Sequence, residues 1–303
     1  MKMKNAIKRY AVQLAIAVAI ATTSVSCGPN QSSTAGQPAA RSVLDKVKRE
    51  RVMHAGIIPY PPFVTKDPNK NTYSGYFVEL MDEITKLMGE TNNPVRIEYE
   101  ETTWGGMVAG LKNERFDVVV SGVFSTIPRG MEVTWARPCM YVGMSALVKA
   151  NDDRFKTPSD LARPGISVAV AAGEVGHEYL KKYLPNAKSI VLQTADTAAP
   201  ALEVSTGSAE VALAESTALV QYARKHPEVK AIFVERPLFT YATSVMIRRG
   251  DPEWLDFLNR AIEFMQLAGV TERLDQKYNA SGEFWISPAK PWVPGGSGAG
   301  AKQ

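Results

Sequence analysis

The amino-acid sequence predicts an α/β fold made of two lobes. Short apolar runs of strand length alternate with helical patterns along most of the chain, and this alternation is typical of parallel sheets flanked by helices. Between its two ends the 303-residue chain is also long enough for two lobes that each bury a core of their own.

The predicted strands are seven apolar runs, at residues 52–58, 95–99, 117–120, 145–148, 167–170, 211–213 and 231–234. A helix is predicted over residues 76–88, because its apolar side chains recur at the spacing of a one-sided helix, at Phe77, Leu80, Met81, Ile84 and Leu87. Further helical patterns follow at residues 174–183 and 251–268.

Residues 1–26 are predicted to be a secretory signal peptide. Four basic residues come first, an apolar run extends from Ala11 to Ala21, and small residues lead to Cys27. The run is too short to span a membrane comfortably, so the protein is expected to be exported to the periplasm or cell envelope. Cys27 stands where bacterial lipoproteins carry their lipidated cysteine, although Ser24 replaces the leucine preferred there. Lipid anchoring through Cys27 is expected, with ordinary cleavage nearby as the alternative.

Residues 27–42 are predicted to be a flexible tether and residues 287–303 a disordered tail, because both are dominated by small and polar residues with little to bury. If Cys27 is acylated, Cys139 has no partner for a disulfide and is expected to be a small buried residue.

The charge balance argues against a nucleic-acid partner. Of the 35 Lys and Arg residues four lie before Cys27, which leaves 31 basic residues against 31 Asp and Glu. Nucleic-acid binding requires clustered surplus positive charge, so this class of function is excluded.

The most informative segment runs from Asp117 to Arg129. Asp117 to Val120 is predicted to be a buried strand, a Ser-Gly turn follows, and a short polar segment brings Arg129 to the end of the strand. Ligands of open α/β sheets bind beyond the carboxyl ends of strands, and a guanidinium there can hold a carboxylate in a fixed two-pronged geometry. A small anionic or zwitterionic ligand is therefore predicted, with a surface ion pair of Arg129 as the alternative.

From about Val43 to Tyr278 the chain resembles the solute-binding proteins of ABC importers for polar amino acids, which have the type II periplasmic binding fold. The resemblance is carried by short segments that follow one another in the family's order, namely Gly56–Phe63, Gly75–Leu80, Trp104 with Leu111 and Phe116–Asp117, Ser121–Arg129, Trp135–Pro138, Val168–Val170 with Gly173, Ala201–Leu202 with Gly207 and Glu210, and Asp251–Trp254.

This resemblance implies two lobes joined by two hinge strands. Lobe 1 would comprise residues 43–147 and 241–286, and lobe 2 residues 148–240. The first boundary falls where residues 149–153 interrupt the strand and helix pattern, and the second crossing is expected near residues 235–243.

The resemblance also implies roles for two charged residues. Arg129 matches the arginine that holds a ligand's α-carboxylate, and Glu215 matches the acid that holds its α-ammonium, whereas Glu210 matches a structural position. The family usually has aspartate where Glu215 stands. The alternative for Glu215 is a solvated charge at the start of a helix.

Other ligand contacts are implied from the same segment of lobe 1. Thr126 and the backbone of Gly122 would complete the contacts to the ligand's charged ends. Phe124 stands where most members have Ser or Thr, so either Ser125 compensates or the ligand presents its charge differently.

Glu174 stands where the family usually has threonine, at the start of a predicted helix. We expect a helix cap there, with a second contact to a ligand cation as the alternative. Tyr60 and Trp104 match positions that flank the ligand and offer stacking faces. Family members that bind basic amino acids carry an acid where this chain has Ile57 to Pro59, so a lysine or arginine ligand is disfavoured, although Glu174 and Glu79 leave it open as an alternative.

Neither a metal, a cofactor nor catalysis is indicated, because the three histidines are scattered and no nucleophile elbow or phosphate-binding glycine loop occurs. The expected function is capture of an amino acid or similar small zwitterion for an ABC permease in the membrane, by a monomeric receptor. The alternative is an enzyme like the periplasmic cyclohexadienyl dehydratases, which resemble these receptors. In that case Glu215 or Glu174 would be the general acid, and Arg129 would hold the substrate's carboxylate.

Overall fold

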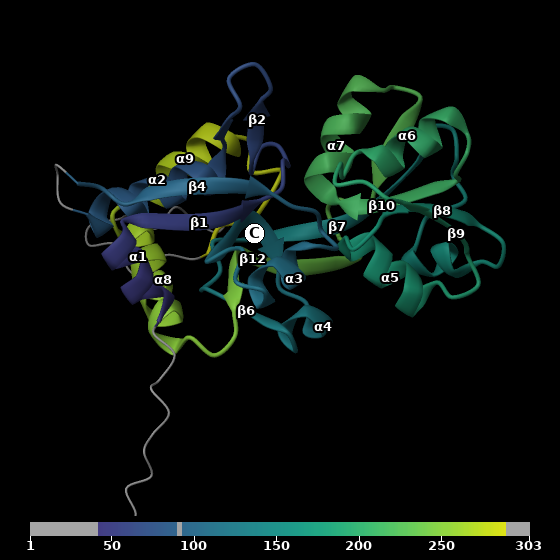
Figure 1. Ribbon diagram of the computed structural model, residues 1–303. Helices are drawn as coiled ribbons and strands as arrows, with labels where there is room; N and C mark the ends of the chain where they lie inside the picture. Colours follow the sequence, from purple (N-terminus) through teal and green to yellow (C-terminus); the bar gives the residue numbers. More distant parts are fainter. Residues whose placement is uncertain (1–41, 90–92, 289–303) are drawn as a thin grey trace, which may run out of the picture. The chain divides into compact units, whose positions relative to one another are not determined.

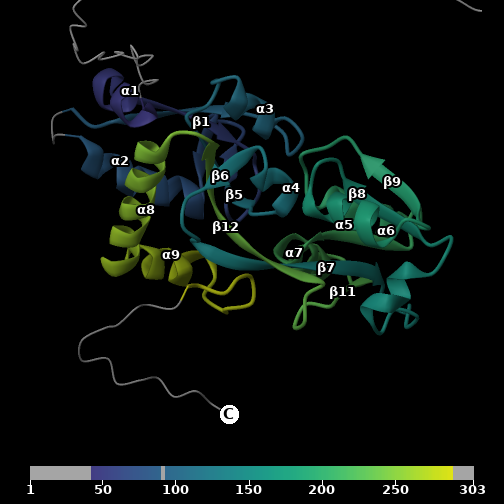
Figure 2. The ribbon, with the colours of Figure 1, turned by 90° about the horizontal axis from the view of Figure 1, so that it is seen from below.

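The computed structural model describes residues 42–89 and 93–288, so the predicted signal peptide, Cys27 and almost all of the predicted tail lie outside the described residues. The main sheet has the strand order β4-β1-β5-β12-β7-β10-β8-β9, with β6 paired to β12 and β11 paired to β7 (Figures 1 and 2). A separate hairpin is formed by β2 (Thr65–Asp67) and β3 (Thr72–Ser74).

The strands at one end of this sheet are parallel. We call these strands, together with their helices, the first half. It contains β1 (Val52–Ile57), β4 (Arg96–Glu101) and β5 (Val118–Phe124). Every residue of β5 is buried, because helices pack beside this part of the sheet. The helices of this half are α1 (Val43–Glu50), α2 (Tyr76–Met88) and α3 (Met107–Lys112), which pack beside the strands, and α8 (Pro252–Leu267) and α9 (Val270–Tyr278), which pack on these helices and on each other.

The cap of α8 ties the start of the described chain to its later part. Asp251 accepts hydrogen bonds from the Trp254 backbone at 3.0 Å and from the Ser42 hydroxyl and the Val43 backbone, both at 2.7 Å. One carboxylate therefore caps α8 and holds the first turn of α1 against it.

The other parallel end of the sheet, the second half, contains β8 (Ser167–Ala171), β9 (Lys188–Leu192) and β10 (Val211–Glu215). It is accompanied by α5 (Val175–Tyr183), α6 (Ala199–Thr206) and α7 (Ser216–Lys225), which Figure 1 shows, by β11 (Val229–Ile232), which Figure 2 shows, and by the 3-10 helix η1 (Pro158–Ala162). Both halves place helices after parallel strands, which leaves the carboxyl ends of those strands available for a site.

Two long antiparallel strands, β7 (Met140–Lys149) and β12 (Phe239–Arg248), join the halves. β12 pairs with β5 and with β6 (Val133–Trp135) in the first half, and β7 pairs with β10 in the second. The short helix α4 (Ile127–Gly130) follows β5 and lies beside α5 in both ribbon views (Figures 1 and 2).

The predicted α/β class with parallel-rich sheets is confirmed. The helix predicted at residues 76–88 is α2, although Leu87 is 65% exposed and does not belong to its buried face. Cys139 is buried with a free thiol, as expected. The lobe boundaries stay a prediction. β7 runs through the first boundary, between residues 147 and 148, and β12 runs through the second, between residues 240 and 241.

The predicted Ser-Gly turn after Val120 is wrong. β5 continues through Ser121 and Gly122 to Phe124, because β12 pairs along this stretch. Gly122 has a φ of 64°, and a Cβ there would lie 2.4 Å from the ring of Phe77. Glycine at this position therefore allows the Phe77 ring to lie close against the backbone of β5. Near the other end of the described chain, Ser287 donates a hydrogen bond to Asp275, so this first residue of the predicted tail has a defined contact.

Candidate functional site

A cavity of about 10 Å³ lies where the two halves meet, and we call it the Arg129 cavity. Tyr60, Trp104, Phe124 and Glu174 enter it from positions at, or within three residues after, the ends of β1, β4, β5 and β8. This is the expected location of a ligand site in a parallel α/β protein. The full lining is Tyr60, Trp104, Phe124, Arg129, Glu174, Val175 and Thr197.

Arg129 is 8% exposed, and its guanidinium reaches from the first half to the second. It donates hydrogen bonds to the carbonyl oxygens of Phe124 at 3.3 Å and Gly173 at 2.7 Å, and its Nε lies 3.2 Å from Oε1 of Glu178. Burial lowers the pKa of Arg129, while Glu178 opposes that shift. A buried guanidinium facing a cavity is suited to bind a carboxylate.

Glu215 caps α7 and bonds to the first half at the same time. Its carboxylate accepts hydrogen bonds from the backbone N–H groups of Thr217 at 2.6 Å and Ala218 at 3.1 Å, and from the hydroxyl of Tyr60. Burial raises the pKa of Glu215 to about 7, although the bonds from Thr217 and Tyr60 lower it in part. Glu215 is therefore a helix cap as well as a buried acid, and it borders the cavity through Tyr60 rather than lining it.

Glu174 lines the cavity and caps α5, accepting a hydrogen bond from the Gly176 backbone at 2.6 Å. The expected cap is confirmed. Burial raises the pKa of Glu174 to about 7, while Arg129 lowers it and the nearby Glu215 and Glu178 raise it further. Two carboxyl groups that can hold or release a proton near neutral pH thus lie on neighbouring helix starts of the second half.

The aromatic residues form the remaining walls. Tyr60 and Trp104 meet edge to face with centroids 5.6 Å apart, and the Trp104 indole donates to the carbonyl of Ala195 in the second half at 3.0 Å. Phe124 stacks on Tyr241 at 5.3 Å with an angle of 10° between the rings. These faces can contact the apolar part of a small ligand.

Gly122 and Thr126 do not line the cavity. Thr126 caps α4 by accepting a hydrogen bond from the backbone N–H of Arg129 at 3.4 Å, and so helps to position the arginine. Glu178 and Thr197 were not among the predicted site residues. Glu178 could have been found from its spacing, because it follows Glu174 by four residues on a helix and so lies on the same face.

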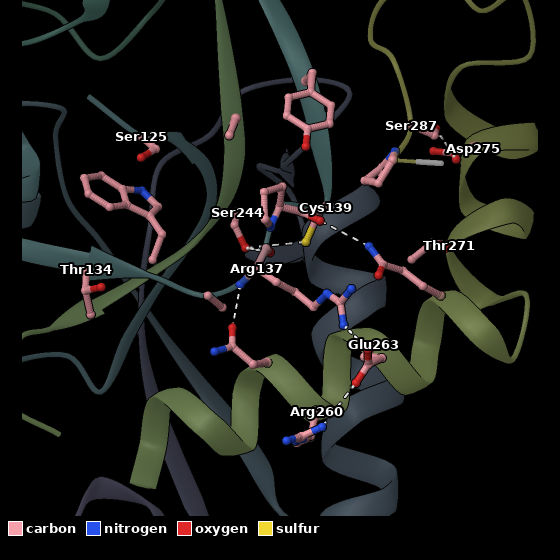
Figure 3. Close-up of a pocket in the computed structure, with 18 of the residues that line it drawn as sticks. Ser125, Thr134, Arg137, Cys139, Ser244, Arg260, Glu263, Thr271, Asp275 and Ser287 are labelled. Carbon is pink, nitrogen blue, oxygen red and sulfur yellow. Dashed lines mark hydrogen bonds and ion pairs between the residues drawn. The ribbon is translucent and has the colours of Figure 1, made fainter. Parts of the chain in front are cut away.

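A second cavity, of about 970 Å³, lies within the first half and the connecting strands (Figure 3). Its Arg137 pairs with Glu263 at 2.6 Å, and Arg260 lies 3.6 Å from both Glu263 and Asp256. The arginines here are thus neutralised by acids of α8. Of the residues that the sequence offered as ligand contacts, Ser125, which was one alternative for the donor missing at Phe124, lines this cavity and not the Arg129 cavity. The second cavity is the larger of the two, but the buried guanidinium and the aromatic walls make the Arg129 cavity the better candidate for a ligand site.

The described part of the chain contains neither a membrane-spanning helix nor a cluster of metal-binding side chains. None of its helices has the length and apolar character that crossing a membrane requires. In residues 42–89 and 93–288, no group of three or more His, Cys, Asp or Glu side chains is arranged to hold a metal ion.

Residues 53–281 match the family of bacterial extracellular solute-binding proteins, family 3, and the chain belongs to this family. It is therefore an exported solute-binding protein by family. The chain is 28% identical over 244 residues to the L-cystine-binding protein TcyJ of Escherichia coli, a match that covers 79% of this chain and 87% of the relative.

Two further similarities bear on catalysis. The crystal structure of the ancestral amino acid-binding protein AncCDT-1, described as a precursor of cyclohexadienyl dehydratase, matches with a TM-score of 0.68 and 30% identity, over 78% of this chain and 99% of that one. The cyclohexadienyl dehydratase of Pseudomonas aeruginosa is 19% identical over 240 residues, which cover 78% of this chain and 86% of the enzyme. The enzyme is thus a more distant relative than the cystine-binding protein.

Proposed function

We propose that this protein captures an amino acid or a similar small zwitterion in the Arg129 cavity and presents it to an ABC permease, and that it is not an enzyme. The observation that carries the proposal is the buried guanidinium of Arg129, which faces a cavity at strand ends that is also lined by aromatic side chains and by Glu174. The amino acid-binding relatives support the same conclusion.

Binding would exchange contacts between the halves for contacts to the ligand. A carboxylate that takes the guanidinium must replace Glu178 and the carbonyl of Gly173, both of which belong to the second half. Ligand entry therefore requires the halves to separate at this point, and β7 and β12 are the strands about which they would move.

The ligand's ammonium would be held by Glu215. A cation beside a buried carboxylate favours its charged form, so binding would lower the raised pKa of Glu215 and release a proton near neutral pH. Tyr60 already donates to this carboxylate and would orient it. Tyr60, Trp104 and Phe124 would contact the ligand's side chain.

A thermal-shift screen of the purified protein against the common L-amino acids tests this proposal. A ligand that binds only the folded state stabilises it by about 2.7 kcal/mol at a concentration of 100 Kd, which raises the melting temperature measurably. Matched carboxylic acids without nitrogen and amines without a carboxylate serve as controls and should give smaller shifts. A melting temperature that no amino acid changes would count against the receptor.

Anchoring through Cys27 and a monomeric state are part of the same proposal. The test of anchoring is the distribution of wild type and Cys27→Ser between membrane and soluble fractions of the producing cells. A wild-type protein found entirely in the soluble fraction would contradict the anchor without affecting the ligand site.

The second candidate function is a dehydratase, and the buried Glu215 with its raised pKa is the observation that favours it. A protonated Glu215 or Glu174 could donate its proton to the departing hydroxyl of prephenate while the carboxylate leaves as carbon dioxide, giving phenylpyruvate and water. We expect no phenylpyruvate above the spontaneous rate when the wild type is incubated with prephenate. Turnover that disappears in Glu215→Gln would support the enzyme instead.

A further inference from the structure

The Arg129 cavity has an excess of acid. The guanidinium of Arg129 has Glu178 and Glu174 near it, and Glu215 lies near Glu174; among these acids only Glu178 forms an ion pair with the arginine. Within the described residues neither Glu174 nor Glu215 has a Lys or Arg nitrogen within 4.0 Å, and their hydrogen bonds come from backbone N–H groups and from Tyr60. Both carboxyl groups are more than nine-tenths buried.

The excess becomes larger when an amino acid binds in the manner proposed above, on which this inference rests. The ligand's carboxylate would take Arg129 from Glu178, and its ammonium would take Glu215. Glu174, which lines the cavity, would then face the ligand's side chain without a cation, and Glu178 lies one helical turn further along α5. Glu174 is 4% exposed, and a buried carboxylate is unfavourable unless it is paired or takes up a proton, so a cationic side chain fits this site better than a neutral one.

We propose that the ligand carries a second positive charge on its side chain, and that Glu174, assisted by Glu178, selects it. The walls suit such a ligand, because Tyr60, Trp104 and Phe124 can pack on an alkyl stem and present ring faces to a cation. The raised pKa of Glu174 agrees with a carboxyl group that lacks a compensating cation in its buried surroundings.

This inference takes up the alternative that the sequence left open through Glu174. A basic ligand was disfavoured because Ile57 to Pro59 supply no acid, and Ile57 and Ile58 are indeed fully buried in the first half. The acid comes instead from the second half, where Glu174 at the start of α5 lines the cavity together with Tyr60 and Trp104, and where Glu178 pairs with Arg129.

The test uses two pairs of ligands that differ in side-chain charge. Calorimetric titrations of the purified protein compare L-lysine with L-norleucine, and L-arginine with its neutral isostere L-citrulline. At least one charged member should bind about tenfold more tightly than its neutral counterpart, which corresponds to about 1.4 kcal/mol.

In Glu174→Gln this preference should fall below about threefold, because the amide can still accept from Gly176 but carries no charge. Glu174→Asp keeps both the charge and a good helix cap and should retain most of the preference. Glu210→Gln is the matched control, because Glu210 pairs with Arg154 and does not line the cavity. If Glu174→Gln fails to fold by circular dichroism, Glu178→Gln takes its place and should reduce the preference.

Equal affinity for the charged and neutral members of both pairs would overturn this inference and leave the capture of amino acids intact. A full preference retained in a folded Glu174→Gln would overturn it as well. Binding of no amino acid at all would refute the proposed function itself, so the two failures are distinguishable.

Discussion

Replacing Glu215 by glutamine should remove a large part of the pH dependence of folding stability. Burial raises the pKa of Glu215 from 4.5 to about 7 in the folded protein. Between these two pH values the folded chain holds a proton that the unfolded chain has released. The stability that this proton contributes is fully present below pH 4.5 and is lost as the pH rises through about 7.

The expected size follows from the two pKa values. One pKa unit corresponds to about 1.4 kcal/mol, so the interval from 4.5 to about 7 amounts to about 3 kcal/mol of unfolding free energy. In Glu215→Gln no carboxyl titrates at this position. The loss of one acceptor for Thr217 or Ala218 lowers the stability at all pH values alike, and it cancels when two pH values are compared.

Urea unfolding followed by circular dichroism at pH 5 and pH 8 measures this effect. From pH 5 to pH 8 the unfolding free energy of the wild type should fall by about 2 to 3 kcal/mol more than that of Glu215→Gln. Glu210→Gln should behave like the wild type, because hydrogen bonds from Ser167 lower the pKa of Glu210 and keep it ionised at both pH values. An identical pH dependence in wild type and Glu215→Gln would refute the reasoning.

Three further predictions concern single side chains of the site. Arg129→Ala should abolish amino acid binding in calorimetry, since removing one partner of a buried ion pair costs about 2 to 5 kcal/mol. Arg129→Lys should bind poorly, because lysine lacks the two-pronged guanidinium that holds a carboxylate. Retained affinity in either variant would contradict the role of Arg129 in holding the ligand's carboxylate. Glu215→Gln should weaken binding of α-amino acids far more than binding of the matching carboxylic acids without nitrogen, and equal losses would indicate a damaged cavity instead. Tyr60→Phe should lower the unfolding free energy at pH 8 by about 1 kcal/mol in urea titrations, because the buried Glu215 loses a donor, and an unchanged value would mean that this bond is unimportant.

Most of the strands of the fold were predictable from the sequence, because apolar runs with clear ends have few other structures available to them. β12 was predicted only as a crossing, since its first residues, from Phe239, are exposed or half-buried and mix polar with apolar types. The extension of β5 beyond Val120 could not be predicted, because it depends on pairing with β12, which lies far away in the sequence.

For the site, the predictions came from the resemblance to the family and, for Arg129, also from its place after a strand. Tyr60, Trp104, Phe124, Arg129 and Glu174 line one cavity, and their contact with a ligand stays a prediction. The pairing of Arg129 with Glu178 was not predictable, because it depends on how the two halves face each other.

The hydrogen bond between Tyr60 and Glu215 escaped prediction for the same reason. Contacts across the halves decide the charge balance of the cavity. The sequence left a contact between Glu174 and a ligand cation open as an alternative, and the structure shows that Glu174 is buried and lines the cavity.

The most direct test of the account is a crystal structure of the protein with its tightest-binding amino acid. We predict that the ligand's carboxylate lies within hydrogen-bonding distance of the Arg129 guanidinium and that Glu178 no longer pairs with Arg129. A ligand bound in the second cavity, beside Arg137 and Glu263, with the contact between Arg129 and Glu178 unchanged, would contradict the central claim.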